Sequence, residues 1–260
     1  MNYAKKSLGQ NFLIDKNIIK KIVSLIKIKN QNIIEIGPGK GALTDEIISR
    51  EPKSLILIEK DTELAKELNK RFSKNKSIKV YNEDILKFNF GIIKNHKFNV
   101  FGNLPYNISS QILIKFLRLK KWPPNFKNII FMFQKELAEK IIGKFPSRNY
   151  GRLSIISNFR LKILKKFLIS SNCFFPKPKI NSMIIHFQPY KNNFFKIKNI
   201  KTLENVTKIL FSNKRKMINK NIKKILNEKE INKLKIKINL RPADLNPEIY
   251  YKISEVYENK

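Results

Sequence analysis

The chain has 260 residues and a formal net charge of +34, with 54 Lys and Arg residues against 20 Asp and Glu residues. Its hydrophobic fraction of 42% is typical of a globular protein with a buried core. The single cysteine, Cys173, excludes an internal disulfide and a cysteine-built metal site, and no apolar run is long enough to span a membrane. The N-terminal stretch MNYAKKSLGQNF has lysines but no apolar core, so we predict no secretory signal and expect a cytoplasmic protein.

The positive charge favours a polyanionic partner, either a nucleic acid or an anionic membrane surface. Residues 191–260 contain 18 basic and 7 acidic residues, so the excess is spread along the chain and does not form a basic tail. A coding bias towards Lys, Asn and Ile is the competing explanation, in which many lysines are only solvated. Because Arg is rare, we expect Arg152, Arg215 and Arg241 to lie where a planar guanidinium is needed. His96 and His186 are isolated and predict no site.

Strands and helices alternate through the first 143 residues. Asp15 is placed to cap a helix with Ile18, Ile22 and Ile26 on one face, and Asp61 to cap a second helix. Three more helices are predicted. One has Leu43 and Ile47 on the same face, another begins at Ser109, and the third ends at Gly143. The predicted strands are NIIEIG (32–37), SLILIEK (54–60), IKVYNED (78–84), FNVFGN (98–103) and NIIFMFQ (128–134). This alternation predicts a doubly wound, mostly parallel α/β sheet.

The pattern changes near residue 160. LKILKKF (161–167) and SMIIHF (182–187) resemble two strands without a helix between them, so we expect them to pair antiparallel at the end of the sheet. After Pro189 only helical spacing remains. We therefore predict two domains, a catalytic domain over 1–190 and a small all-helical domain over 191–260.

A glycine-rich turn, EIGPGKGA (35–42), follows the first predicted strand. Gly37 and Gly39 let backbone approach a ligand, and the next helix offers free N–H groups. The spacing fits both NAD and S-adenosylmethionine. Glu59 ends the second strand and can accept hydrogen bonds from ribose hydroxyls. Asp84 ends the third strand, where it either accepts from an adenine amine or caps the next helix.

Asn103, Leu104, Pro105 and Tyr106 form the second motif, at the end of the fourth strand. An exocyclic aromatic amine is a poor nucleophile because its lone pair is delocalised into the ring. The Asn103 side-chain oxygen and the Leu104 carbonyl can accept its two hydrogens, Pro105 fixes the turn, and Tyr106 offers a flat face for stacking. This scheme needs no metal. The alternative is a purely structural end to the strand.

Two further groups are candidates for contact with a nucleic acid. Phe174, with Phe175, lies in a proline-rich loop and can form the other side of a clamp around a base, or it can be a hydrophobic plug. The second group is a cluster of cations predicted to lie on one helix opposite Ile218 and Ile222, where it suits phosphate contact or forms a solvated face. Its members are Lys214, Arg215, Lys216, Lys220 and Lys223.

With these motifs in place, the chain resembles the ribosomal RNA adenine N6-dimethyltransferases. It is most similar to the bacterial enzymes that act on small-subunit (16S) RNA and whose loss gives kasugamycin resistance. The similar segments run in order along nearly the whole chain: KKSLGQNFL, EIGPGKGALT, LIEKD, NEDIL, GNLPYNIS, FMFQKELAEKI, YGRLSI, FFPKPKINS, KRKMINKNI and RPADLNPEIY.

The resemblance implies a class I methyltransferase sheet, S-adenosylmethionine as cofactor, and dimethylation of N6 on two adjacent adenosines near the 3′ end of the small-subunit RNA within the assembling 30S subunit. It implies that Asn11 and Leu13 close over the cofactor, that Gly37 lines its loop, and that Glu59 and Asp84 hold its ribose and adenine. It places Asn103 at the methyl-accepting site, where it also borders the cofactor, and stacks Tyr106 and Phe174 on the target base. We expect a monomer without a membrane partner.

Three alternatives remain open. A large-subunit RNA methylase of the macrolide-resistance type shares the core motifs, although the RPADLNPEIY ending and the helical domain favour the small-subunit enzyme. A ribosome assembly factor that acts mainly by binding is the second. An NAD oxidoreductase is the third, and it explains neither the charge nor residues 103–106.

Overall fold

The computed structural model describes residues 5, 9–93, 96–191 and 194–260. Residues 6–8 of the KKSLGQNFL motif and the first four residues lie outside the described residues. The chain divides into two compact units. Unit 1 comprises Met1–Phe116, Pro123–Ala138 and Lys162–Pro189, and unit 2 comprises Leu117–Trp122, Glu139–Leu161 and Tyr190–Lys260.

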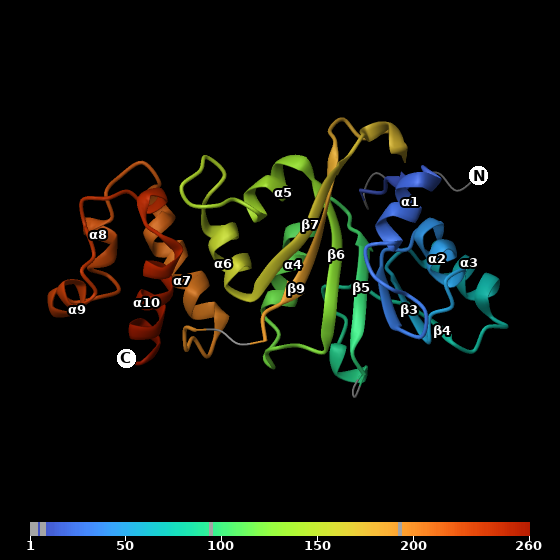
Figure 1. Cartoon of the computed structure of the whole chain (residues 1–260), viewed down its shortest axis with the longest axis horizontal. Coiled ribbons are helices and arrows are strands. Elements are labelled where there is room, and N and C mark those ends of the chain that lie inside the picture. The colour runs from blue at the N-terminus through green and yellow to red at the C-terminus, as the bar shows by residue number, and fades with distance from the viewer. Residues whose placement is uncertain (1–4, 6–8, 94–95, 192–193) are drawn as a thin grey trace. The chain divides into compact units, whose positions relative to one another are not determined.

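Unit 1 is built on a seven-stranded sheet with the order β4-β3-β2-β5-β6-β9-β7 (Figure 1). The pairs from β4 to β6 are parallel, and β9 runs antiparallel to β6. The predicted class I methyltransferase sheet is therefore confirmed, including the late antiparallel strand. The strands are β2 (Asn32–Ile36), β3 (Ser54–Glu59), β4 (Ile78–Asn82), β5 (Phe98–Asn103), β6 (Phe126–Gln134), β7 (Leu161–Ile169) and β9 (Ser182–Pro189).

The central strands β2, β3 and β5 are buried almost throughout, as expected for a parallel sheet that is covered on both faces. Figure 1 shows α1, α2 and α3 gathered at the end of the sheet that contains β3 and β4. The helices that begin in unit 1 are α1 (Lys16–Val23), α2 (Ala42–Ile48), α3 (Thr62–Phe72), α4 (Ser109–Leu117) and α5 (Lys135–Ile141). Asp15 and Asp61 cap α1 and α3, as predicted, by accepting from backbone N–H groups in the first turn.

One helix boundary differs from its prediction. Helix α1 ends at Val23, so Ile26 is outside it, and the buried stripe contains Ile19 and Ile22 while Ile18 is only partly buried. The Leu25 N–H donates to the Ile22 carbonyl, which tightens the chain into a turn before Ile26. Over so few residues, apolar side chains at helical spacing do not show where the helix ends and the following turn begins.

A short separate sheet forms beside the main one. Strand β1 (Phe12–Leu13) pairs antiparallel with β8 (Phe174–Phe175), with Phe12 opposite Phe175 and Leu13 opposite Phe174. Leu13 and Phe174 are buried in the same hydrophobic cluster as α1 and α2. This pairing joins the N-terminal segment to the proline-rich loop.

Unit 2 is helical. Its helices are α6 (Arg152–Arg160), α7 (Ile200–Leu210), α8 (Asn219–Ile222), α9 (Glu228–Lys233) and α10 (Pro247–Glu258). Residues 139–161, which the sequence analysis assigned to the catalytic domain, group with the C-terminal helices. Buried tyrosines bind them there, since the Tyr150 hydroxyl donates to the Leu245 carbonyl and the Tyr251 hydroxyl to the Ile155 carbonyl. Which domain performs which function stays a prediction.

Arg160, which was not among the predicted arginines, makes contacts that need a planar guanidinium group. Arg160 is 4% exposed, donates to the carbonyls of Leu117 and Leu119, and lies over the Trp122 ring. Burial lowers its pKa from the usual value to about 10. Arg160 therefore ties α6 to the chain after α4 within unit 2.

Candidate active site

A cavity of about 600 Å³ lies at the carboxyl ends of β2, β3, β4 and β5. Ligands in open α/β folds bind at this edge. Its walls include the segments 9–14, 35–40, 58–60, 83–85 and 103–108, together with residues of α1 and α2. All the predicted cofactor residues line this cavity, namely Asn11, Leu13, Gly37, Glu59, Asp84 and Asn103.

The glycine-rich turn approaches the cavity with its backbone. Gly37 and Gly39 have φ values of 65° and 57°, which L residues with side chains rarely adopt. A Cβ atom on Gly39 would lie 3.0 Å from the Phe12 ring. Glycine at this position therefore leaves room for the N-terminal segment to pack directly on the turn.

Glu59 lies at the end of β3, 7% exposed, and both of its carboxylate oxygens accept backbone hydrogen bonds. Oε2 accepts from the Gly39 N–H at 3.0 Å, and Oε1 from the Asp61 N–H at 2.8 Å. Burial raises its pKa, and the two backbone donors act in the opposite direction. Each carboxylate oxygen has a further lone pair, so the fixed carboxylate can still accept from a ligand.

Asp84 follows β4, and the residues after it form a turn, so the helix that the capping alternative predicted is absent and Asp84 caps this turn instead. Its Oδ1 accepts from the Leu86 N–H at 2.9 Å, and its Oδ2 accepts from the Lys60 Nζ at 2.9 Å. Burial acts to raise its pKa, but these two donors outweigh burial and the pKa is lowered. Because Asp84 also lines the cavity, the cap and a contact to an adenine amine are compatible.

Lys115 holds the segment that carries Asp84. From α4 its Nζ donates to the carbonyls of Leu86 at 2.9 Å and Phe88 at 2.7 Å. Its pKa is lowered by burial, which Asp84 and Glu83 oppose. This contact could not be inferred from the sequence, because one lysine among 54 cationic residues carries no distinguishing pattern.

Glu35, near the end of β2, is a buried acid that sequence reasoning missed. It is 1% exposed and accepts from the Thr44 hydroxyl at 2.7 Å. Burial raises its pKa to about 8, which the Thr44 hydrogen bond opposes. At neutral pH this carboxyl is therefore mostly protonated, whereas Glu59 has two backbone donors that favour its charged form.

Asn103 is the last residue of β5, one residue beyond the strand's buried run. Its Nδ2 donates to the Asn11 carbonyl at 3.0 Å. A carbonyl only accepts, so this bond determines which end of the amide is the donor. The Asn103 Oδ1 is consequently held as an acceptor at the cavity.

The turn after Asn103 is closed by its own hydrogen bonds. The Ile108 N–H donates to the Pro105 carbonyl at 3.2 Å, and the Ser109 hydroxyl donates to the Tyr106 carbonyl at 3.1 Å. Leu104 is 1% exposed and folds back onto Gly102, where a Cβ would lie 2.6 Å from the Leu104 Cδ2. The glycine before Asn103 therefore permits the chain reversal that leaves residues 103–106 facing the cavity.

Tyr106 is half-buried and hydrogen-bonded. Its hydroxyl lies 2.6 Å from the Ser182 hydroxyl at the start of β9. Burial raises its pKa, and the Ser182 bond acts in the opposite direction. The ring orientation is thus set from a second strand, which the sequence motif alone did not indicate.

Phe174 lies elsewhere than a base clamp requires. It is 3% exposed inside the hydrophobic cluster, while Phe175 is 64% exposed. The β1–β8 pairing decides this, since successive residues of a strand point to opposite faces and Leu13 takes Phe174 into the core. In this structure the hydrophobic-plug alternative applies to Phe174, and a stacking role for it stays a prediction.

The predicted basic helix is wrong. Helix α8 covers four residues, Asn219–Ile222, and the preceding residues form turns. The Ile218 N–H donates to the Leu240 carbonyl, a long-range bond that interrupts helical pairing. Lys223 also forms an ion pair with Glu228 at 3.0 Å. All five predicted cations are nevertheless exposed: Lys214, Arg215, Lys216, Lys220 and Lys223.

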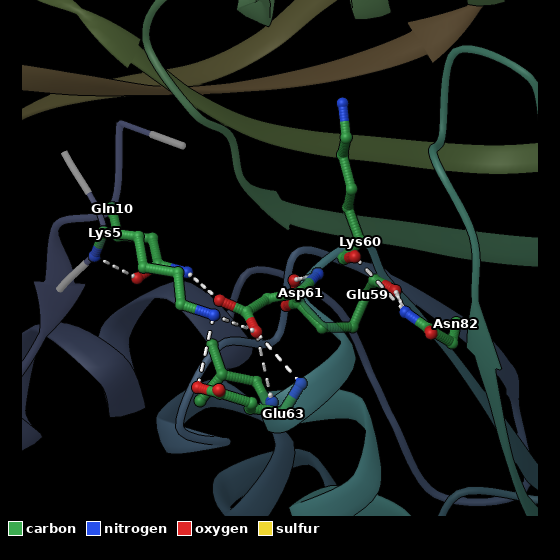
Figure 2. A network of polar contacts seen from close by, with 8 residues as sticks. Lys5, Gln10, Glu59, Lys60, Asp61, Glu63 and Asn82 are labelled. Carbon is green, nitrogen blue, oxygen red and sulfur yellow. Dashed lines mark hydrogen bonds and ion pairs between the residues drawn. The ribbon is translucent and has the colours of Figure 1, made fainter. Parts of the chain in front are cut away.

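Figure 2 shows a network that the sequence analysis did not predict, centred on Asp61. Its side chain accepts from the Lys5 Nζ at 3.1 Å and the Gln10 Nε2 at 3.0 Å. Burial acts to raise the pKa of Asp61, but these bonds outweigh it and the pKa is lowered. The sequence identified Asp61 only as a helix cap, because its partners are more than 50 residues away.

The described part of the chain has no group of three or more His, Cys, Asp or Glu side chains arranged to hold a metal ion. Nor does it contain a helix that is both long and apolar enough to cross a membrane.

Comparisons with known proteins agree with this geometry. The family model for ribosomal RNA adenine dimethylase matches residues 1–259. A protein named ribosomal RNA small subunit methyltransferase A, from Pelagibacter ubique (strain HTCC1062), is 46% identical over 264 residues, covering 98% of this chain and 97% of the relative. A protein of the same name from Wolbachia sp. subsp. Drosophila simulans (strain wRi) is 40% identical and covers 94% of this chain and 90% of its own.

Among solved structures, a dimethyladenosine transferase from Plasmodium falciparum has a TM-score of 0.78 at 26% identity, covering 93% of this chain and 95% of its own. The 23S rRNA methyltransferase ErmE has a TM-score of 0.70 at 23% identity, covering 95% of this chain and all of its own, which supports the shared fold. The chain belongs to the ribosomal RNA adenine dimethylase family.

Proposed function

We propose that this ribosomal RNA adenine dimethylase methylates N6 of two adjacent adenosines in the 3′-terminal hairpin of small-subunit RNA, within the assembling 30S subunit. The names of the Pelagibacter and Wolbachia relatives support the small subunit over the large-subunit alternative. The net charge of +34 supports an RNA partner. We further propose that the enzyme is cytoplasmic, acts as a monomer and takes part in small-subunit biogenesis.

The cavity fits S-adenosylmethionine, which supplies an electrophilic methyl group when bound. Gly37 and Gly39 have the positive φ angles that allow a close backbone approach, and a buried carboxylate ends β3. Glu59 would accept from the two ribose hydroxyls, and Asp84 from the adenine amine, with Ile85 beside it in the cavity wall. Asn11 and Leu13 would cover the cofactor from the N-terminal segment.

The residues at the end of β5 are suited to activating an aromatic amine. The Asn103 Oδ1 and the Leu104 carbonyl would each accept one amine hydrogen, which draws the nitrogen away from the plane of the base and frees its lone pair. The Tyr106 ring would hold the base flat by stacking. As the amine attacks, its positive charge grows, and acceptors that are already oriented stabilise that charge without reorganising.

The observation that carries this proposal is the fixed amide of Asn103. Its bond to the Asn11 carbonyl holds the nitrogen away from the target position and leaves the oxygen as an acceptor. An amide free to rotate would present a donor to the amine half of the time and would lose this advantage.

The test is single-turnover methylation of small subunits that lack the modification, with primer extension to locate the product, because dimethyladenosine stops reverse transcriptase. Asn103→Ala should lower the rate by about 10²–10³, the usual cost of losing one preorganised polar contact in a transition state. Cofactor affinity, measured by calorimetric titration, should change little.

Asn75→Ala, which removes an exposed amide outside the cavity, is the control and should match wild type. A near wild-type rate in Asn103→Ala would show that residues 103–106 only end the strand. Stops in large-subunit RNA in place of small-subunit RNA would overturn the substrate assignment.

A further inference from the structure

The N-terminal segment 9–13 contacts both halves of the active site. On the cofactor side, the Phe12 ring packs on Gly39 of the glycine-rich turn. On the target side, the Asn11 carbonyl accepts from Asn103 at 3.0 Å. Gly9 lies against the loop after Tyr106, since a Cβ on Gly9 would be 3.3 Å from the Asn107 Oδ1. The position of this one segment therefore affects both sites.

One polar contact fixes the segment from its N-terminal side. The Gln10 Oε1 accepts from the Lys5 N–H at 2.8 Å, so its Nε2 must face Asp61, whose Oδ2 accepts at 3.0 Å (Figure 2). The Asp61 side chain is only 2% exposed, which strengthens a charge-assisted hydrogen bond. The Lys5 Nζ adds an ion pair to the Asp61 Oδ1 at 3.1 Å, but this lysine is 41% exposed and contributes less.

The same aspartate holds Glu59. Its backbone N–H donates to the Glu59 Oε1 at 2.8 Å, while its side-chain Oδ1 caps α3 through the Glu63 N–H at 3.0 Å. Asp61 is thus bound to the helix, to the ribose-binding acid and to the segment over the cavity at once. A cap alone would need only one of these contacts.

We propose that Asp61 is a positioning residue, which through Gln10 holds the segment 9–13 in place and so keeps the Asn103 amide oriented towards the target amine. Asp61 does not touch the reacting atoms. It acts through a series of contacts, from Asp61 to Gln10, along the backbone to Asn11, and from the Asn11 carbonyl to the Asn103 Nδ2. The proposal rests on the methyltransferase function proposed above.

Exchanging the donor and the acceptor tests this link. Asp61→Asn keeps an oxygen for the α3 cap but turns an amide nitrogen towards Gln10, and Gln10→Glu places two carboxylates at hydrogen-bonding distance. Each single variant should lower the single-turnover rate by about 10- to 100-fold, because small misplacements of a catalytic group cost this much. The double variant Asp61→Asn, Gln10→Glu restores a donor facing an acceptor and should recover most of the rate.

Hydrogen exchange of residues 9–14 in the protein without cofactor gives a readout independent of activity. Exchange should be faster in both single variants and return towards wild type in the double variant. Asp15→Asn is the matched control, since the Asp15 side chain caps α1 in the same way, whereas Gln10 donates to Asp61. It should leave rate and exchange at residues 9–14 unchanged.

The inference is overturned if the double variant is no better than the worse single variant, or if Asp15→Asn causes the same loss. A wild-type protein that binds no S-adenosylmethionine and methylates no subunit would refute the proposed function. The exchange measurement would still decide whether Asp61 orders the segment.

Discussion

The cavity and the segment 214–223 carry charge in opposite ways. At the cavity and next to it, the carboxylates of Glu59 and Asp61 are each at most 7% exposed, and each accepts from a named donor. In the segment 214–223 the predicted cations are exposed, and most of the chain before α8 forms turns. Buried groups of this kind act through orientation at short range, whereas exposed lysines act through a field that salt screens.

This difference predicts how the two regions respond to substitution. Removing a buried carboxylate should weaken cofactor binding strongly and leave the ionic-strength dependence of that binding unchanged. Removing an exposed lysine should lower the affinity for RNA only weakly. Its main effect should be on how steeply that affinity depends on salt. The experiments below test this contrast, in order of decreasing effect.

Glu59→Ala should weaken S-adenosylmethionine binding most. A carboxylate that accepts from two hydroxyls contributes about 1.5–3 kcal/mol for hydrogen bonds to a charged group, which corresponds to about 10- to 100-fold in affinity. The loss also frees the Gly39 N–H that Glu59 now binds. Calorimetric titration measures the loss of affinity, which should be the same at two different salt concentrations.

Glu59→Gln removes the charge and keeps one acceptor oxygen, for the Gly39 N–H or the Asp61 N–H, while its NH2 group faces the other donor. It should bind the cofactor with intermediate affinity. Unchanged affinity in both variants, or tight NADH binding by wild type, would contradict the assignment of Glu59 to the ribose.

Tyr106→Ala should weaken capture of the target adenosine by about 1–3 kcal/mol, the usual contribution of one base–aromatic stack. Tyr106→Phe keeps the ring but loses the 2.6 Å bond to Ser182, and should cost about 1 kcal/mol. Ser182→Ala removes the same bond without touching the ring and is the matched control. Single-turnover rates at subsaturating subunit concentration measure all three.

The single-turnover rate of Tyr106→Phe could fall as far as that of Tyr106→Ala while Ser182→Ala loses little. In that case the hydroxyl has a direct role and stacking is the wrong explanation.

The sequence was informative where the backbone places the residue. Glu59, Asp84 and Asn103 follow apolar strands, and parallel strands bring their carboxyl ends to one edge, so the site could be assembled without coordinates. The mostly parallel sheet with a late antiparallel strand followed from the alternation and from the family resemblance, which the comparisons confirm.

It was uninformative where a distant contact decides. The Ile218 N–H binds the Leu240 carbonyl and prevents the expected basic helix. The Leu13–Phe174 pairing decides which of two adjacent phenylalanines is buried. Asp61 and Gln10 are joined across 51 residues, and neither has a local pattern that predicts the other.

Glu35→Gln should change the pH dependence of stability. The pKa of Glu35 is about 8 in the folded protein and about 4.5 in the unfolded chain. Below about pH 4.5 Glu35 is protonated in both states and does not lower the free energy of unfolding. As pH rises from about 4.5 to 8, only the unfolded chain ionises, so the free energy of unfolding falls. The neutral amide does not titrate. The melting temperature of the variant relative to wild type should therefore rise between pH 6 and pH 9, by about 2–4 °C for each kcal/mol.

Thr44→Val is the second arm of this experiment, because the Thr44 hydroxyl donates to Glu35 and acts to lower its pKa. It should raise the folded-state pKa of Glu35 further, so that the fall in stability continues to higher pH. A parallel pH profile in wild type and Glu35→Gln would mean that Glu35 is ionised in the folded protein.

Lys216→Ala with Lys220→Ala should have the smallest effect, a few-fold loss of affinity for small-subunit RNA near physiological salt. Each phosphate contact releases counterions, so losing two should reduce the slope of log affinity against log salt by about 2 at most. Lys66→Ala with Lys70→Ala removes the same charge from the exposed face of α3 and is the control. Because net charge changes equally in both pairs, a flatter slope only in the first pair assigns a local phosphate contact to the turns before α8. Equal slopes in both pairs would mean that these lysines contribute only to the general field of the protein, and that an exposed cation in this chain does not by itself mark an RNA contact.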